Sequence, residues 1–462
     1  MNKCLRLSPL LAFAVFAACV PVRAIRIAPP ATAAVSSGDT TILASPILSS
    51  QCITGKKSPG EKLSSIEDYG SYVIGYAEFD DQGWSYSAES QLEAIRARLQ
   101  AELQNPAYVE MDFSVIVFVH GWHHNAHDND CNVQEMRQMI SLSNARFKTA
   151  FDAGKLKRQR RLFGIYAGWR GESVDAALLR YTTVLDRRNA AEKVAKGSIR
   201  QLLANLHAQE RSARLASGRD RKKDQVDWAD RMFTTVVGHS FGGLIVFNGL
   251  SQYLIDDLTI ACAGEVTALT GEEPSVWPDE VVLINPAFEA SRFETLNRLA
   301  EQSANCRGLS KLPLLTVITA DNDQWTGGNF TAARRILTLF EPYDDSTPEA
   351  REREKDANIH AIGFVKRYKT HRLCLERYKG PDGVDTLRAV VFPLDAAAPR
   401  PAGITRQVWA VGAPKSIVNG HNGFLYAPSP SGPQPYLLDW LVAMHIPASG
   451  VVTDQAKCAV GM

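Results

Sequence analysis

The sequence has almost no excess charge of either sign and few long apolar runs. Among its 462 residues, 51 are Lys or Arg and 50 are Asp or Glu, so the formal net charge is +1. This balance predicts no acidic partner and gives no support to nucleic-acid binding. Beyond the N-terminal stretch, no run is long and apolar enough to span a bilayer. The 45% hydrophobic content is enough for one large domain or for two.

Motifs for metal binding are also missing. No Cys-x-x-Cys spacing occurs among the eight cysteines, which argues against a thiol-rich zinc site. His120, His123 and His124 lie within five residues of one another. No carboxylate stands at the spacing of a His-Glu-x-x-His helix, so we expect His123 and His124 to be loop residues. The sequence therefore predicts no metal site.

The N-terminus has the features of a secretory signal at residues 1–24. Lys3 and Arg6 precede a short apolar run over residues 10–18. Residues 16–19, FAAC, resemble a bacterial lipobox with lipidation at Cys19, although Phe stands where Leu is usual. The competing site is cleavage after Ala24. We favour lipidation at Cys19, which predicts an exported lipoprotein attached to the membrane of the cell envelope. Cleavage after Ala24 predicts a periplasmic or secreted protein.

Export changes what the cysteines predict. Loss of Cys4 with the signal and acylation of Cys19 leave six cysteines, which allow up to three disulfides in an oxidising compartment. Cys262 and Cys306 flank one strand–helix unit and form a candidate pair.

The order of apolar and polar segments predicts an α/β fold. Residues 25–65 are rich in small and turn-forming residues and predict a flexible lead-in to a domain over residues 66–462. Short apolar segments alternate with helical ones, which favours a mainly parallel sheet with helices on both faces. The predicted strands are 72–79, 113–119, 161–167, 233–237, 280–287, 312–319 and 406–411, and the predicted helices include 90–103, 134–151 and 436–444.

A helical and basic insertion is predicted at about residues 173–231. Residues 155–231 hold 19 Lys or Arg and 9 Asp or Glu, a charge of +10. The simpler interpretation is a solvated helical surface. The functional one is a cap over the site or a basic face for an anionic membrane.

Residues 233–243, FTTVVGHSFGG, have the pattern of a nucleophile elbow. A β-branched strand leads into Gly238-x-Ser240-x-Gly242, and an apolar helix follows. Small residues are required where such a strand meets the helix. The turn would raise the Ser240 hydroxyl above the sheet at the positive end of that helix. Ser240 is therefore the predicted nucleophile.

A nucleophilic serine needs a base, and the base needs an acid that orients it. In hydrolases with this elbow, the acid and then the histidine follow the serine along the chain. Asp321 and Asp323 both follow a predicted strand, and we favour Asp323. His421 is the best base, because it follows the last predicted strand and precedes the last helix, unlike the other later histidines, His360, His371 and His445.

The predicted oxyanion donors are two backbone N–H groups. The strand 113–119 ends at His120-Gly121-Trp122, and the loop after this strand supplies one donor in such enzymes. The residue after the nucleophile supplies the other. These donors would be the N–H groups of Trp122 and Phe241, and Gly121 would allow a close backbone approach.

Together these motifs resemble the α/β-hydrolase superfamily, and most of all its little-characterised bacterial lipase- or esterase-like members. The resemblance covers about residues 72–445. It implies the α/β-hydrolase fold, a serine esterase or lipase without a cofactor, an acid at Asp323 and a base at His421. It transfers no substrate, because this fold hosts many chemistries. The matching segments are EFDDQGW (78–84), FVHGWHHNA (118–126), YAGWRG (166–171), VVGHSFGG (236–243), NPAFEA (285–290) and TADNDQWTG (319–327).

We therefore expect an exported serine hydrolase that cleaves a small-molecule or lipid carboxylic ester. The first alternative is a non-catalytic, envelope-anchored binding protein on a hydrolase scaffold. The second is an acyltransferase that uses the same site.

Overall fold

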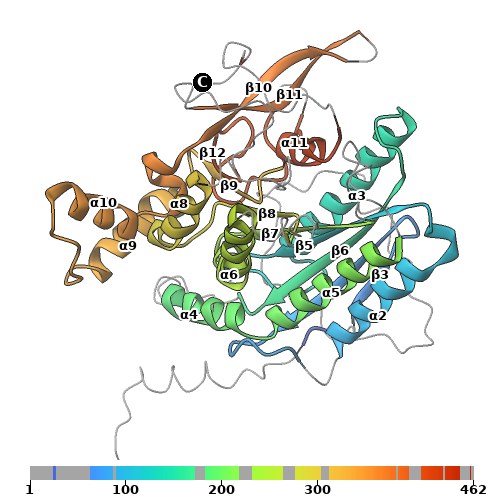
Figure 1. Ribbon diagram of the computed structural model, residues 1–462, viewed down its shortest axis with the longest axis horizontal. Coiled ribbons are helices and arrows are strands. Elements are labelled where there is room, and N and C mark those ends of the chain that lie inside the picture. Colours follow the sequence, from blue (N-terminus) through green and yellow to red (C-terminus); the bar gives the residue numbers. More distant parts are fainter. Residues whose placement is uncertain are drawn as a thin grey trace, which may run out of the picture.

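A ten-stranded sheet forms the centre of the computed structural model, which describes residues 24–27, 63–86, 90–171, 183–217, 231–263, 276–302, 312–380, 383–394, 407–429, 432–447 and 458 (Figure 1). Its strands are β3 (Ile66–Asp68), β4 (Tyr72–Phe79), β5 (Asp112–Val119), β6 (Arg160–Trp169), β7 (Met232–His239), β8 (Glu280–Ile284), β9 (Leu315–Ala320), β10 (His371–Lys379), β11 (Asp385–Pro393) and β12 (Val408–Ala413).

The sheet is parallel except at its two edges. The strand order is β11-β10-β12-β9-β8-β7-β5-β6-β4-β3. Only the edge pairs β10–β11 and β3–β4 are antiparallel. A separate parallel pair joins β1 (Arg26–Ile27) to β2 (Leu63–Ser64). The described part of the chain therefore has the mainly parallel α/β architecture that the sequence predicts.

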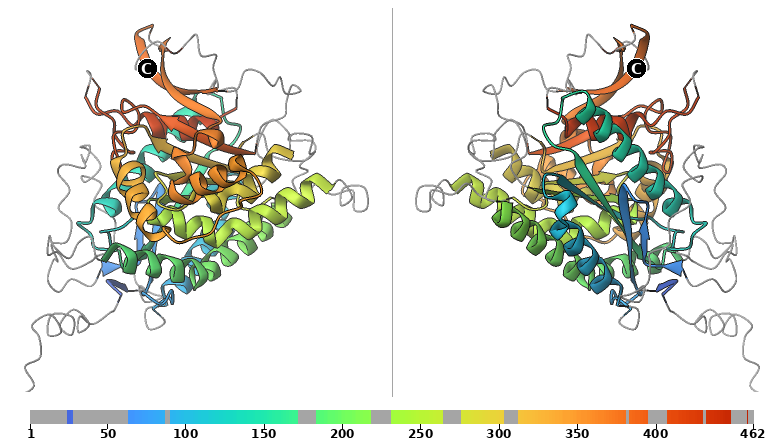
Figure 2. Two further views of the ribbon diagram at one scale, coloured as in Figure 1. Left: turned by 90° about the vertical axis from the view of Figure 1, so that its left-hand side faces the viewer. Right: turned by 90° about the vertical axis from the view of Figure 1, so that its right-hand side faces the viewer.

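Helices cover both faces of this sheet (Figure 2). Two hydrophobic cores lie between the sheet and the helices. On one face are α2 (Gln91–Gln104), α4 (Thr183–Lys196), α5 (Ile199–Ser217), α6 (Phe241–Ala263) and α8 (Glu294–Gln302). On the other are α3 (Cys131–Asp152) and α11 (Tyr436–Met444), while α9 (Phe330–Leu337) packs against α10 (Pro348–Ile359).

The strands contribute to both cores because successive side chains point to opposite faces. In β5, Val115, Val117 and Val119 belong to the core beneath α6, whereas Phe118 belongs to the core beneath α3. A strand buried on both faces must be apolar throughout. This is why continuous apolar runs identified the central strands in the sequence.

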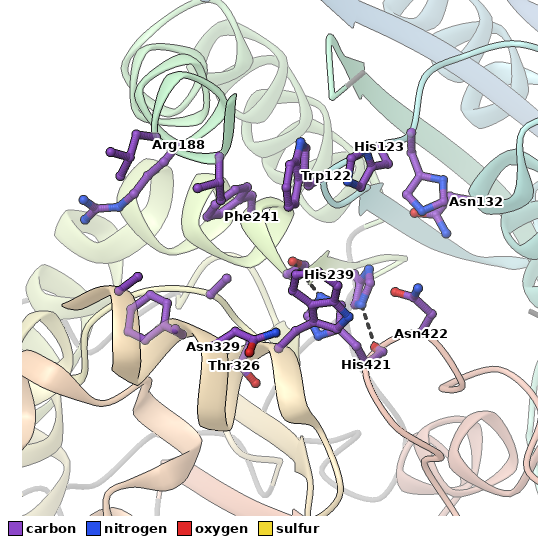
Figure 3. A pocket seen from close by; sticks show the side chains of 18 of the residues that line it. Trp122, His123, Asn132, Arg188, His239, Phe241, Thr326, Asn329, His421 and Asn422 are labelled. Carbon is purple, nitrogen blue, oxygen red and sulfur yellow. Dashed lines mark hydrogen bonds between the residues drawn. The ribbon is translucent and has the colours of Figure 1, made fainter. Parts of the chain in front are cut away.

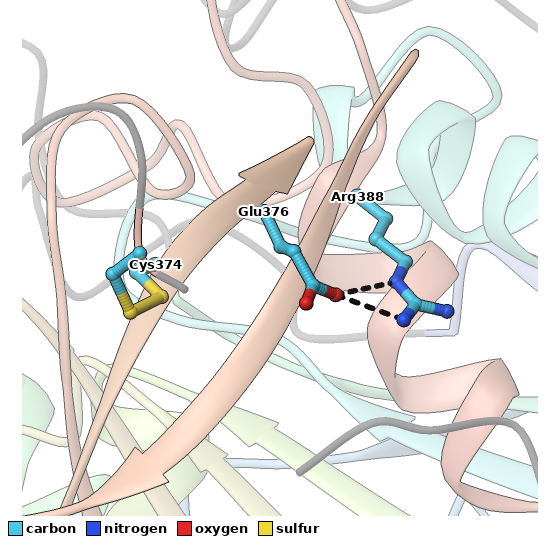
Figure 4. Close-up of a disulfide and its surroundings, with 4 residues drawn as sticks. Cys374, Glu376 and Arg388 are labelled. Carbon is cyan, nitrogen blue, oxygen red and sulfur yellow. Dashed lines mark hydrogen bonds and ion pairs between the residues drawn. A yellow bond between two sulfur atoms is a disulfide. The ribbon is translucent and has the colours of Figure 1, made fainter. Parts of the chain in front are cut away.

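The edge hairpin formed by β10 and β11 was not predicted. Its strands carry charged side chains between apolar ones, and Glu376 pairs with Arg388 across the hairpin at 2.8 Å (Figure 4). Charged residues flank the short apolar run of β10, and β11 contains an apolar run of only four residues, 389–392. A disulfide joins Cys374 of β10 to Cys458, with 5.6 Å between the Cα atoms. Cys131 is also disulfide-bonded.

In the basic segment at 173–231, the structure describes residues 183–217. They form the helices α4 and α5, which lie between β6 and β7 along the chain. Ala191 and Val194 of α4 and Leu202 and Leu206 of α5 are buried in the core above the sheet. These two amphipathic helices carry seven Lys or Arg and three Asp or Glu, which is +4 of the +10 counted over residues 155–231.

The ends of the expected lead-in also belong to the fold. Arg26 is buried and donates to Ala126 O and Glu67, and β1 pairs with β2. The remaining lead-in, residues 1–23 with Cys19, and the side chains of Cys262 and Cys306 lie outside the described residues. Among the helices that the structure describes, none combines the length and apolar character needed to cross a bilayer.

Candidate active site

The candidate site lies at the carboxyl edge of the sheet. Strands β5, β7, β8, β9 and β12 are parallel, so their carboxyl ends meet at this edge. The chain leaves β5 for β6 on one side and then crosses to β7 on the other. Such a reversal of strand order opens a crevice at the ends of the strands.

Ser240 occupies the sharp turn between β7 and α6. Its φ of 55° is in the left-handed region, which non-glycine residues rarely adopt. Two hydrogen bonds hold this conformation: Ser240 N donates to Ile284 O at 3.0 Å, and Ala287 N donates to Ser240 O at 3.1 Å. The strain therefore falls on the predicted nucleophile, as in a nucleophile elbow.

Gly242 lets the start of α6 approach the end of β5. A Cβ atom at this position would lie 2.0 Å from Val119 O and 2.6 Å from His120 O. Any larger residue would push the turn away from β5. The absence of a side chain thus brings Ser240 and the loop after β5 together.

Two hydrogen bonds connect the three predicted side chains. Ser240 Oγ lies 2.9 Å from His421 Nε2, and His421 Nδ1 lies 2.8 Å from Asp323 Oδ2. An ionised carboxylate can only accept, so Nδ1 carries the proton and Nε2 is free to accept from Ser240. This is the arrangement in which an imidazole can remove a proton from a serine.

Asp323 is held as an acceptor. Burial alone would raise the pKa of Asp323, but the hydrogen bonds and charge from His421 and the hydrogen bonds from Thr326 lower it below its ordinary value. Its Oδ1 also accepts from Trp325 N at 2.9 Å. Asp321, the alternative acid, instead forms an ion pair with Arg372 at 2.7 Å. Of the two carboxylates, Asp323 is therefore the one bonded to His421.

The loop that carries His421 is fixed through its backbone. Asn285 Nδ2 donates to Gly420 O at 3.1 Å and to His421 O at 2.8 Å, while its Oδ1 accepts from Ala320 N. His239 Nε2 also donates to His421 O, at 2.9 Å, and Asn322 Oδ1 accepts from Gly420 N at 2.8 Å. The ends of β7, β8 and β9 thus all hold this loop.

The two predicted oxyanion donors lie next to Ser240. Within the described part of the chain, the N–H groups of Trp122 and Phe241 donate to no protein acceptor. A Cβ on Gly121 would lie only 3.0 Å from Ser240 Cβ, so a glycine is needed for this approach. Two N–H groups left without partners beside a serine are available to a ligand oxygen.

His120 braces the loop that carries Trp122. Its Nδ1 donates to Gly121 O at 2.8 Å, and its Nε2 accepts from Trp169 N at 2.9 Å. Burial and the neighbouring His124 lower the pKa of His120 to about 4. His120 is therefore a neutral structural residue near neutral pH.

A cavity of about 490 Å³ opens over Ser240 (Figure 3). This volume is in the range of small-molecule sites. Figure 3 shows Asn132 and Asn422 on one side of His421 and Arg188 at the opposite end. Apolar side chains make up most of the surface that lines the cavity, among them Val184, Leu185, Phe241, Ala287, Phe330, Ala333 and Leu337.

The end near Asn132 is polar. His124 Nδ1 lies 3.1 Å from Asp130 Oδ1, and Asn132 Nδ2 donates to Glu135 at 2.6 Å. Burial raises the pKa of Glu135 to about 7. Within the described residues, no group of three His, Cys, Asp or Glu side chains is arranged to hold a metal ion.

Several residues of the site were not singled out in the sequence. Asn285 and His239 hold the His421 loop, and Thr326 donates to Asp323. All three lie within the segments that carry the resemblance: His239 ends β7, Asn285 directly follows β8, and Thr326 lies beyond Asp323 in the segment after β9. For Asn285, a polar side chain directly after a buried strand was the available signal.

No protein-family model and no curated protein sequence matches the chain. A search of solved structures found, among its matches, phospholipase PlaB from Legionella pneumophila in complex with thio-NAD. The match has a TM-score of 0.21 and 15% sequence identity, and it covers 64% of this chain. It spans about half of the phospholipase chain, 53%. At this level the likeness carries no argument about function.

The neutral state of His239 predicts how stability depends on pH. Burial and the charge of His421 hold the pKa of His239 well below its ordinary value. Below pH 6.5 the unfolded chain therefore binds a proton here that the folded chain does not. The free energy of unfolding therefore falls by up to about 1.4 kcal/mol for each unit by which the pH drops below 6.5.

We expect His239→Gln, which can still donate to His421 O, to lose less stability than the wild type between pH 7 and pH 5. Urea unfolding at both pH values measures this difference. Equal losses in the two proteins would show that His239 titrates in the folded chain as it does in the unfolded one.

Proposed function

We propose that the protein is a serine hydrolase that cleaves carboxylic esters through an acyl-enzyme. The observation that carries the proposal is the pair of hydrogen bonds from Ser240 through His421 to Asp323, at 2.9 and 2.8 Å. The strained turn at Ser240 and the parallel order of the strands support an α/β-hydrolase fold.

In the first half of the reaction, Ser240 Oγ attacks the ester carbonyl carbon while its proton passes to His421 Nε2. The N–H groups of Trp122 and Phe241 stabilise the negative charge that develops on the carbonyl oxygen. The tetrahedral intermediate collapses, and the C–O bond to the alcohol breaks. The alcohol leaves with the proton from His421, and the acyl group remains on Ser240.

In the second half, a water molecule replaces the alcohol. His421 removes its proton, and the hydroxide attacks the acyl carbon. The bond to Ser240 Oγ breaks, and His421 returns the proton to that oxygen. The ionised Asp323 stabilises the protonated His421 in both halves.

We also propose that the protein is exported, with lipidation at Cys19 or cleavage after Ala24. The disulfide between Cys374 and Cys458 and the disulfide-bonded state of Cys131 support an oxidising compartment. The substrate would be a small-molecule or lipid ester, in keeping with a largely apolar cavity.

Removal of the nucleophile is the first test of the proposal. We expect a fluorophosphonate probe to label the wild type and not Ser240→Ala, because only an activated serine attacks the phosphorus. Hydrolysis of a p-nitrophenyl ester should fall by about 10⁶ in kcat. Labelling of neither protein, with both folded, would contradict catalysis and favour a binding protein.

The same assay separates the two acids. We expect Asp323→Asn to lower kcat by about 10⁴, because the amide stabilises the wrong tautomer of His421. Asp321→Asn is the matched control and should retain kcat within a few-fold, because Asp321 bonds to Arg372 instead. A larger loss in Asp321→Asn than in Asp323→Asn would reverse the assignment.

A further inference from the structure

Arg188 of α4 lines the end of the cavity that lies away from Asn422 (Figure 3). Its side chain is 20% exposed. A guanidinium group has five N–H donors. Within the described part of the chain only its Nη2 donates, to Glu289 Oε1 at 2.5 Å. Glu192 Oε1 lies 3.9 Å from Nη2, within ion-pair distance but beyond hydrogen-bond distance. The Nε–H is buried and has no partner there.

The carboxylate beside Arg188 is already neutralised by other side chains. Glu289 also pairs with Arg334 at 2.9 Å and with Arg292 at 3.1 Å. Glu192 pairs with Arg292 at 2.7 Å. Three guanidinium groups thus face two carboxylates, which leaves one positive charge in this cluster.

Arg334 also lines the cavity, but its donors are engaged. Its Nε and Nη2 donate to the backbone and side-chain oxygens of Asn358, and its Nη1 pairs with Glu289. Burial alone would raise the pKa of Glu289, but the charges of Arg188 and Arg334 hold it below its ordinary value. Arg334 therefore stabilises the Glu289 charge, and Arg188 retains the unused donors.

The Nη1 group of Arg188 has no acceptor in the described part of the chain. It can therefore donate a charge-assisted hydrogen bond to a carboxylate or phosphate oxygen in the cavity. Apolar side chains make up most of the surface that lines this cavity.

We propose that Arg188 binds an anionic oxygen group, a carboxylate or a phosphate, that is carried by the substrate at a distance from the scissile ester. The inference rests on the proposed ester hydrolysis for its placement in a substrate site. It makes the substrate an amphipathic anionic ester, whose apolar part lies between Ser240 and Arg188. Arg188 is then a specificity-determining residue of the cavity.

Binding to the Ser240→Ala protein tests this inference without any turnover. Isothermal titration with octyl phosphate, octanoate and octanol compares two anions with a neutral molecule of the same chain length. We expect at least one anion to bind ten times more tightly than octanol or better, because Arg188 Nη1 donates a charge-assisted hydrogen bond to it and the cluster carries one surplus positive charge. The stronger of the two anions identifies the group as phosphate or carboxylate.

When Arg188→Gln is added to Ser240→Ala, the anion and octanol should bind with affinities that differ by less than threefold. Arg188→Lys keeps a charge next to Glu289, but its one ammonium group would have to serve both Glu289 and the ligand, so its ratio of anion to octanol affinity should fall at least threefold below that of Arg188. This second variant decides the question if Arg188→Gln does not fold. Arg335→Gln removes a positive charge from the exposed surface of α9 and should keep the full ratio.

Three results would overturn the proposal. They are anions that bind no more tightly than octanol, a ratio that Arg188→Gln and Arg188→Lys leave unchanged, and an equal loss in Arg335→Gln. Because no ester is cleaved in this experiment, a failure of the proposed hydrolysis would show separately in the p-nitrophenyl ester assay.

Discussion

The position of one imidazole ring governs the whole site. His421 lies on a loop, where backbone hydrogen bonds of a helix or sheet cannot fix it. Its backbone is instead held by Asn285, His239 and Asn322, which follow or end neighbouring strands. The parallel sheet therefore positions His421 through side chains at its carboxyl edge, and Ser240 and Asp323 then bond to the two ring nitrogens.

Electrostatics around the ring favour a single protonation pattern. Asp323 is kept ionised and can only accept from Nδ1. His239 and His120, although close to the site, are kept neutral by burial, so neither adds a positive charge beside His421. The basic side chains of the cavity are placed at its far end, around Glu289, where they do not compete for Asp323.

Much of this arrangement could be predicted from the sequence, for physical reasons. Central strands are buried on both faces, so continuous apolar runs identify them in the sequence. The helix at residues 436–444 has the bounds that the sequence predicts. The position of Ser240 could be predicted because the strained turn that carries it requires a glycine at Gly242, and this glycine is part of the motif in the sequence. His421 could be ranked first among the later histidines because it follows the last parallel strand.

Other features could not be predicted because they depend on contacts between distant segments. The strands of the edge hairpin have short apolar runs next to charged residues, and the disulfide partner Cys458 is 84 residues beyond Cys374. The role that we propose for Arg188 depends on Glu289, which lies on another element and also pairs with Arg334. Charge counts over residues 155–231 showed an excess of arginine, but not which one faces the cavity.

The central claim is that Ser240 attacks a carbonyl whose oxygen is held by Trp122 and Phe241. A crystal structure of the protein after reaction with a small alkyl fluorophosphonate tests it most directly. The account predicts phosphorus bonded to Ser240 Oγ, with its phosphoryl oxygen about 2.7–3.1 Å from both backbone nitrogens. An unmodified Ser240, or a phosphoryl oxygen directed away from these two groups, would contradict it.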